Sequence, residues 1–135
     1  MLLTVEKTII LHETSIFSET PEALLVNVAS ILKEIEVKKG ETIIRKGSMG
    51  SSMFIIFEGK VKVHDEDHNI ATLGPGEVFG ELAVLDPEPR MASVTALEDT
   101  KLFKIEQDIF YEMMAEQINV AKGIMRVLCK RLRDK

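Results

Sequence analysis

The sequence has no tryptophan, a single cysteine and no long apolar run, and these absences exclude several classes of protein. One cysteine, Cys129, cannot form a disulfide within the chain, so a disulfide scaffold is excluded. No apolar run reaches the ~18 residues that a membrane-spanning helix needs. The opening residues MLLTVEK do not begin with the basic segment of a secretory signal. We therefore expect a chain without a membrane span that works in the cytoplasm, or at the cytoplasmic face of a membrane within a larger protein.

The charged residues are unevenly distributed along a composition that is otherwise ordinary for a globular protein. The 135 residues are 45% apolar and 29% charged, which predicts a single domain, 1–135, with a core of its own. The net charge is −5, but residues 122–135 carry six basic side chains and one acidic one, so the 121 residues before them carry −10. An acidic body does not attract nucleic acid, and basic residues at the end of a helix stabilise its dipole. We expect no nucleic-acid binding by this chain.

Hydrophobic periodicity divides the chain into a helical lead-in at 1–30, a strand-rich part at 31–106 and helices at 107–135. In the lead-in, Thr20 is the expected N-cap of a helix whose first position is Pro21. Alternating or β-branched runs predict strands at 31–37, 42–45, 53–57, 60–64, 70–73, 92–96 and 101–105, and helical spacing predicts helices at 107–114 and 119–132. Short strands at this spacing indicate a sandwich or jelly roll.

One segment, FGELAVLDPEPRMASVTA at residues 79–96, has the residue types of an anion site. Gly80 allows the backbone to approach a ligand closely, and a short helix starting at Glu81 would point its first amides outward. Arg90 follows two prolines that end this helix, and a guanidinium facing such amides binds phosphate or carboxylate. The carboxylate of Glu81 would repel a phosphate but readily accepts a hydroxyl. A phosphate and a hydroxyl close together describe the ribose of a nucleotide.

The segment resembles the phosphate-binding cassette of cyclic nucleotide-binding domains, a family that includes the regulatory subunits of protein kinase A and the catabolite activator protein. The similarity extends to VKKGETIIRKGSMGSSMFIIFEGKVKV at 37–63, whose glycines lie at the family's turn positions. It implies a mainly β fold: an eight-stranded antiparallel jelly roll (a double-stranded β-helix) with N-terminal helices, a cassette at 79–94 and a C-terminal lid helix. It also implies a regulatory protein that is not an enzyme and needs no cofactor.

The resemblance implies a role for each residue of the cassette. Glu81 would accept the ribose 2′-hydroxyl, Gly80 would permit close approach, and Arg90 would bind an exocyclic oxygen of the cyclic phosphate. The other expected ligand-binding residues are Leu82, Ala83, Met91 and Ala92, of which Leu82, Ala83 and Ala92 would offer backbone amides to the phosphate. Val63 and Leu73 are expected to line the base.

Two residues depart from the family's pattern. Met91 stands where a serine or threonine often follows the arginine and favours guanine, so we expect cyclic AMP to be preferred over cyclic GMP. Ser51 stands where many members carry an aspartate that reports ligand binding through the arginine. The residue by which the last helix would cover the base is not evident before Lys135.

The leading hypothesis is a sensor module that binds a cyclic nucleotide and relays its occupancy through the C-terminal helix to an effector domain absent from this chain. The alternative is a degenerate jelly roll with an empty pocket, used for protein interaction or dimerisation. Arg90 could then be a structural residue paired with Glu81 or Glu88. A jelly-roll metalloenzyme is disfavoured because the three scattered histidines lack the spacing of metal ligands. We expect a monomer or a weak homodimer.

Overall fold

The computed structural model describes residues 2–135, apart from the side chains of Leu82 and Ala83. Contacts between residues divide the chain into two compact units. One is a strand-rich unit at 33–107, and the other is a helical unit formed by the residues before 33 together with those after 107. All of the cassette at 79–94 lies in the strand-rich unit.

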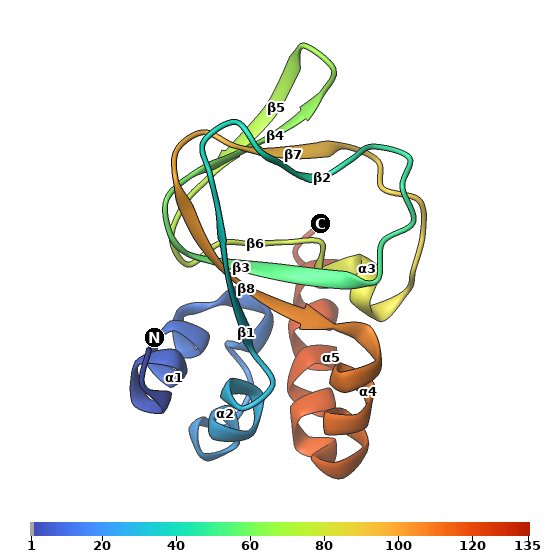
Figure 1. Ribbon diagram of the computed structural model, residues 1–135. Helices are drawn as coiled ribbons and strands as arrows, with labels where there is room; N and C mark the ends of the chain where they lie inside the picture. The colour runs from blue at the N-terminus through green and yellow to red at the C-terminus, as the bar shows by residue number, and fades with distance from the viewer. Residues whose placement is uncertain (1) are drawn as a thin grey trace. The chain divides into compact units, whose positions relative to one another are not determined.

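The strand-rich unit contains eight strands and one short helix. They are β1 (Lys33–Val37), β2 (Thr42–Ile44), β3 (Ser52–Glu58), β4 (Val61–Asp65), β5 (His68–Leu73), β6 (Val78–Phe79), α3 (Glu81–Leu85), β7 (Ser93–Ala96) and β8 (Thr100–Glu106). The strands form two four-stranded sheets, in the orders β1-β8-β3-β6 and β2-β7-β4-β5, and every pairing is antiparallel. Figure 1 shows β2 and β7 facing β3 and β6 across the unit. The predicted eight-stranded jelly roll is confirmed.

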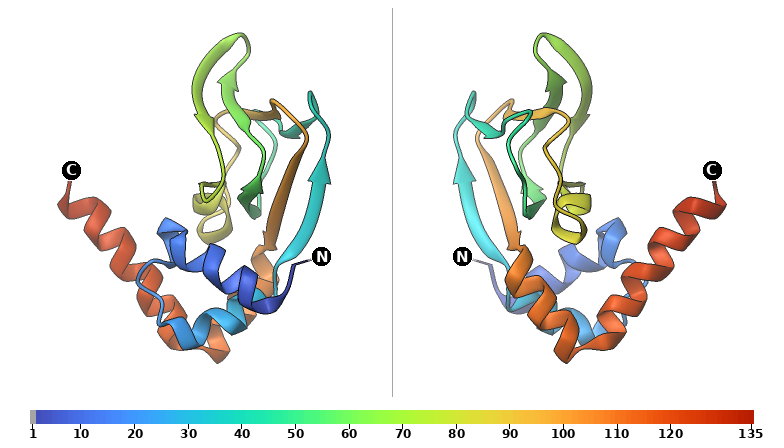
Figure 2. Two further views of the ribbon diagram at one scale, coloured as in Figure 1. Left: turned by 90° about the vertical axis from the view of Figure 1, so that its left-hand side faces the viewer. Right: turned by 90° about the vertical axis from the view of Figure 1, so that its right-hand side faces the viewer.

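The apolar core of the roll lies between its two sheets. Both sheets contribute to it, through the buried side chains of Ile44, Phe54, Ile56, Val61, Phe79, Val94 and Leu102. Phe54 and Phe79 stack with their ring centroids 5.0 Å apart, which ties β3 to β6 beyond the area that each ring buries. The β4–β5 hairpin projects beyond the other strands in both views of Figure 2, and five of the six residues of β5 are exposed.

The helical unit is formed by the two ends of the chain. Its elements are α1 (Thr4–Glu13), the single 3-10 turn η1 (Ser15–Phe17), α2 (Glu22–Ala29), α4 (Gln107–Glu116) and α5 (Ile118–Arg133). The first residue of α4, Gln107, still belongs to the strand-rich unit. Within the helical unit α5 packs on η1, and the rings of Phe17 and Phe110 meet edge to face at 6.3 Å.

Two details differ from the sequence-based prediction. The N-cap of α2 is Pro21, not Thr20, because Pro21 is extended at φ −54° and ψ 135° and the helix begins at Glu22. The hydroxyl of Thr20 is instead buried and has no hydrogen-bond partner among the described residues. The strand pattern also missed β6, whose two residues are too few to show any periodicity, although they pair with Phe54 and Ile55 of β3.

Candidate functional site

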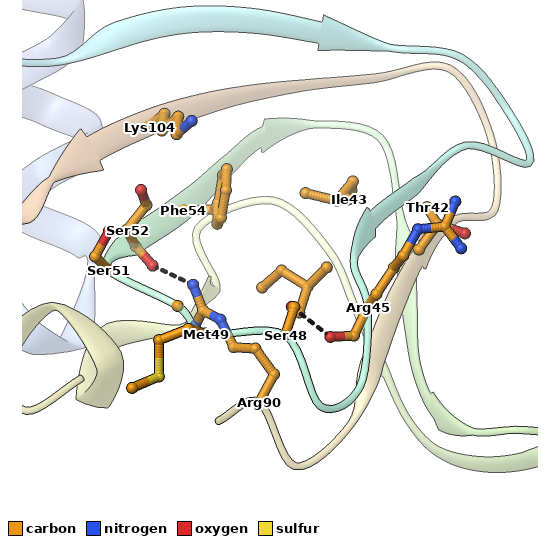
Figure 3. Close-up of a pocket in the computed structure, with 12 residues that line it drawn as sticks. Thr42, Ile43, Arg45, Ser48, Met49, Ser51, Ser52, Phe54, Arg90 and Lys104 are labelled. Carbon is orange, nitrogen blue, oxygen red and sulfur yellow. Dashed lines mark hydrogen bonds between the residues drawn. The ribbon is translucent and has the colours of Figure 1, made fainter. Parts of the chain in front are cut away.

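Arg90 lies in the segment that enters β7, and the β2–β3 loop holds its side chain in place. Its guanidinium donates through Nη2 to the carbonyl of Ser52 at 2.8 Å. A Cβ at Gly50 would overlap the same guanidinium, so only glycine leaves room for the Arg90 side chain there. Figure 3 shows Arg90 reaching toward Ser52 at the start of β3. The orientation of the guanidinium is thus fixed by backbone atoms of the loop.

Backbone hydrogen bonds join the β2–β3 loop to the segment around Arg90. The N–H of Arg90 donates to the carbonyl of Ser48 at 2.8 Å, and its carbonyl accepts from Gly47 N–H at 2.7 Å. The N–H of Lys46 donates to the hydroxyl of Ser93 at 2.9 Å. Two loops that are about 40 residues apart in the sequence are therefore held together as one structure around Arg90.

The charge of Arg90 is not neutralised within the described part of the chain. Its side chain is half-buried, and the structure gives it no ion pair with Glu81, Glu88 or any other described carboxylate. Burial lowers the pKa of the Arg90 guanidinium, which still stays protonated at any physiological pH. A half-buried cation paired only with a neutral carbonyl attracts an external anion, since a charge-assisted hydrogen bond would offset its lost hydration.

Gly80 lies beside Arg90 at the junction of β6 and α3, and Glu81 follows it in the chain. Gly80 has φ +79°, and a Cβ there would lie 2.8 Å from Nη1 of Arg90 and 2.9 Å from the carbonyl oxygen of Ser52. Any other residue would therefore push the guanidinium away. Glu81 is the first residue of α3 and is half-buried. Leu82 and Ala83 follow in the first turn of α3, where their backbone amides were predicted to contribute, and their side chains lie outside what the structure describes.

The remaining predicted residues lie at different depths in the roll. Met91 follows Arg90 and its side chain is 88% exposed, whereas Ala92 is half-buried. Val63 and Leu73, on β4 and β5, are partly buried and pack on the core cluster between the sheets. The structure thus brings Gly80 close to Arg90, while the side chain of Met91 points into solvent.

A cavity of about 320 Å³ opens on one side of Arg90, a volume at the small end of ligand sites. Its lining residues come from β2, the β2–β3 loop, β3, β8 and the segment before β7 that carries Arg90, and Figure 3 draws them. Three of them are cations, Arg45, Arg90 and Lys104, and none of the described lining residues is acidic. The cavity therefore suits an anionic group.

Sequence reasoning missed the residues that support Arg90. Gly50 and Ser52 looked only like parts of a glycine- and serine-rich loop. The spacing of the loop glycines was a signal, but a close approach to a side chain 40 residues later is invisible in a local pattern.

No metal site or membrane span emerges from the described residues. Between residues 2 and 135, no three His, Cys, Asp or Glu side chains gather in a way that could hold a metal ion. None of the helices that the structure describes has both the length and the apolar character needed to cross a bilayer.

Comparison with known proteins gives one consistent family. The family model of the cyclic nucleotide-binding domain matches residues 34–117. The CRP-like cAMP-activated global transcriptional regulator of Mycobacterium tuberculosis is 30% identical over 129 residues, which are 92% of this chain and 58% of the relative. Human cGMP-dependent protein kinase 2 is 36% identical over 107 residues, covering 74% of this chain and 14% of the kinase. The chain spans little more than half of the first relative and far less of the second.

A solved structure shows the same fold. The N-terminal domain of a transcriptional regulator from Streptomyces coelicolor superposes with a TM-score of 0.86 at 28% identity. The superposition covers 93% of this chain and 91% of that domain. The superposition therefore includes residues of both the strand-rich and the helical unit of this chain.

Proposed function

The chain belongs to the cyclic nucleotide-binding domain family, and from that premise we propose that it is a sensor module that binds cyclic AMP in preference to cyclic GMP. The family is a regulatory one, and its ligand is a cyclic nucleotide. The proposal for this chain adds the residues that hold the ligand, the preferred base and the route by which occupancy is reported.

The observation that carries the proposal is the environment of Arg90. It is a half-buried cation whose one side-chain hydrogen bond within the described residues goes to the neutral carbonyl of Ser52. Gly80 lies against Nη1, the other terminal nitrogen of Arg90, and directly precedes α3. The first N–H groups of α3 are therefore close to the guanidinium. A cyclic phosphate carries one negative charge and would provide the missing counter-charge by charge-assisted hydrogen bonds.

The remaining residues are assigned around this contact. Glu81 accepts the 2′-hydroxyl of the ribose, and the amides of Leu82, Ala83 and Ala92 complete the phosphate site. Val63 and Leu73 are partly buried apolar residues on the inner surface of the roll, which supports placing the base beside them. We assign Met91 to the site through its backbone alone, because its side chain is 88% exposed.

The preference for cyclic AMP rests on the residue after the arginine. A hydroxyl at position 91 could hydrogen-bond to a guanine base, but the thioether of Met91 is only a weak acceptor. The relatives include both a cAMP-activated regulator and a cGMP-dependent kinase, so the base preference must come from this chain's own residues.

Occupancy would be reported through the C-terminal helices to an effector domain outside this chain. The large apolar residues exposed on α5 are Ile118, Met125 and Leu132, and three side chains are too few for a stable interface, so in this proposal the chain by itself is a monomer or a weak homodimer. In this proposal the chain acts in the cytoplasm, binds no nucleic acid and catalyses no reaction.

Calorimetric titration of the chain with cyclic AMP, cyclic GMP and 5′-AMP tests the proposal. We expect one site, tighter binding of cyclic AMP than of cyclic GMP, and much weaker binding of 5′-AMP, whose open phosphate carries a further charge. Absence of heat with all three at millimolar concentration would overturn the proposal in favour of a roll with an empty pocket. Tighter binding of cyclic GMP would overturn only the base preference.

A further inference from the structure

Ser52, the first residue of β3, is bonded to two different segments of the chain. Its carbonyl accepts from Nη2 of Arg90 at 2.8 Å. Its hydroxyl donates to Oε2 of Glu106, the last residue of β8, at 2.9 Å. Ser52 is 8% exposed, so both bonds are shielded from water, and losing either would leave a buried polar group unsatisfied. Ser52 thus ties the anion-site cation to the end of β8.

Gln107 makes a second pair of bonds from the next position in the chain. Its N–H donates to the carbonyl of Ser51 at 3.0 Å. Its side-chain amide donates through Nε2 to the carbonyl of Val84, inside α3, at 3.3 Å. Gln107 is therefore bonded both to the loop that holds Arg90 and to the short helix that follows Gly80.

These bonds link Arg90 to α3 by a continuous path, which we call the hydrogen-bond circuit. It runs from Arg90 to Ser52, from Ser52 to Glu106, along the chain to Gln107, and from Gln107 to Val84 in α3. Arg90 and α3 are the two walls between which the phosphate is proposed to lie. A displacement of either wall therefore acts on the same two residues, 106 and 107, at the end of β8.

The circuit ends where the chain leaves the roll. Gln107 is the last residue of the strand-rich unit and also the first residue of α4. The carboxylate of Glu106 is held by Ser52 and by Lys104, whose Nζ lies 3.1 Å from Oε1. Burial raises the pKa of the Glu106 carboxyl, but the hydrogen bonds from Ser52 and Lys104, together with the attraction of Lys104 and Lys33, bring it below its ordinary value. The junction is thus held by charged as well as neutral bonds.

We infer that Ser52 and Gln107 are positioning residues that set Arg90 and α3 for the anion and pass the state of the site to the first turn of α4. The inference deepens the proposed function, because it rests on that function for the identity of the anion as a cyclic nucleotide. The hydrogen-bond circuit itself involves only residues of this chain, so its coupling can be measured without any ligand.

The first test uses the ligand-free chain and NMR. Arg90→Gln removes the guanidinium, and we expect the N–H of Gln107 to exchange with solvent at least about fivefold faster. In the reverse direction, Gln107→Ala should broaden or shift the Nε–H resonance of Arg90. Lys38→Gln and Asn69→Ala, which remove an exposed cation and an exposed amide of the same unit, should change neither signal by more than about twofold.

The second test adds saturating cyclic AMP. In the parent chain we expect slower exchange of the amides in the first turn of α4. In Ser52→Ala and Gln107→Ala we expect binding about 3- to 10-fold weaker and most of that slowing lost. Ser30→Ala is the matched control, because its hydroxyl also donates to a nearby backbone carbonyl, that of Asn27 at 2.6 Å, and Ser30 belongs to the helical unit, outside the circuit.

The two tests separate the inference from the function on which it rests. If cyclic AMP and cyclic GMP fail to bind the parent chain, the proposed function is wrong, and the ligand-free test still decides whether the circuit couples Arg90 to Gln107. If Arg90→Gln leaves Gln107 exchange unchanged and Gln107→Ala leaves the Arg90 resonance unchanged, the inference is overturned whatever the ligand does. Should Arg90→Gln fail to fold, the Gln107→Ala spectrum alone decides: an unmoved Arg90 resonance overturns the coupling, and a shifted one supports it.

Discussion

Arg90 in the roll and Lys130 in the helical unit are cations in opposite circumstances. Lys130 lies on α5 with an exposed side chain and pairs with Glu19 at 2.8 Å. Arg90 is half-buried, and its guanidinium has a neutral carbonyl as its partner. A charge that is removed from water needs compensation more than one that stays in it, yet the compensated cation is the exposed one.

The difference supports the proposal that Arg90 binds a ligand, whereas Lys130 has a structural partner. The Lys130–Glu19 pair joins two segments of the helical unit and, like most exposed ion pairs, contributes little to stability. Around Arg90 the chain instead provides glycines at 50 and 80 and backbone bonds that fix the side chain. These contacts fix the side chain of Arg90 without neutralising its charge. Less conformational free energy is therefore lost when an anion binds to it.

The largest expected difference between the two cations is in their contribution to ligand affinity. Arg90→Ala should weaken cyclic AMP binding by about 2–5 kcal/mol, or roughly 30-fold to several thousandfold. Lys130→Ala is the matched control, and its affinity should stay within about twofold of the parent. Titration calorimetry of the three proteins, with circular dichroism to verify folding, is the measurement. Equal losses of affinity in the two variants would show that Arg90 contributes no more to ligand binding than Lys130 does.

The next effect is the stabilisation of the folded chain by its ligand. At ~100 times the dissociation constant, cyclic AMP should add about 2.7 kcal/mol to the free energy of unfolding, or roughly 5–15 °C in melting temperature. Lys130→Ala should keep this shift, and Arg90→Ala should lose it at the same ligand concentration. A parent melting curve that does not move in millimolar cyclic AMP or cyclic GMP contradicts the prediction.

A smaller effect concerns the ribose. The 2′-deoxy analogue of cyclic AMP lacks the hydroxyl that Glu81 is proposed to bind. The parent should therefore bind cyclic AMP more tightly than this analogue by about 1–3 kcal/mol, or roughly 5- to 150-fold. Glu81→Gln should lose most of this preference. Glu77→Gln, an exposed carboxylate just before β6, should keep it. Equal preferences in all three proteins would remove Glu81 from the ribose site.

Most of the roll could be predicted because its strands can be recognised from local patterns. Apolar alternation at 60–64 and the apolar run at 53–57 correspond to β4 and β3, and the glycine- and proline-rich breaks between strands are turns. The two-residue β6 was missed because a period of two needs more than two residues to show. The cap of α2 was misplaced by one residue because Thr20 has a hydroxyl suited to capping and Pro21 is typical of the first helical position, whereas in the structure Pro21 is the N-cap and makes no side-chain cap bond.

The candidate site was only partly predictable, for a different physical reason. Gly80, Glu81 and Arg90 lie within one segment, so their chemistry could be recognised from spacing alone. Gly50, Ser52 and Gln107 reach the site through contacts across 23 to 40 residues. Each of these three is an ordinary residue in its local pattern. Long-range support of a functional side chain leaves no periodic signal in a single sequence.

The smallest effect is a titration, and it compares the carboxylates of the two units. Hydrogen bonding from Lys130 lowers the pKa of Glu19. For Glu106, burial raises the pKa, but bonds from Ser52 and Lys104, with a weaker attraction from Lys33, bring it below its ordinary value. A carboxyl whose pKa is depressed by folding adds stability above its unfolded pKa, and loses it as the pH falls through the folded pKa.

Ser52→Ala should therefore raise the pKa of Glu106 toward its ordinary value and leave that of Glu19 unchanged. The variant should also lose less stability than the parent between about pH 5 and pH 3, because less of it depends on an ionised Glu106. Carboxyl carbon NMR titration measures both pKa values in one sample, and Ser48→Ala is the control. If Ser52→Ala moves neither pKa, the hydroxyl of Ser52 does not lower the pKa of Glu106. The pKa of Glu106 would then not depend on the hydrogen bond that links it to Arg90 through Ser52.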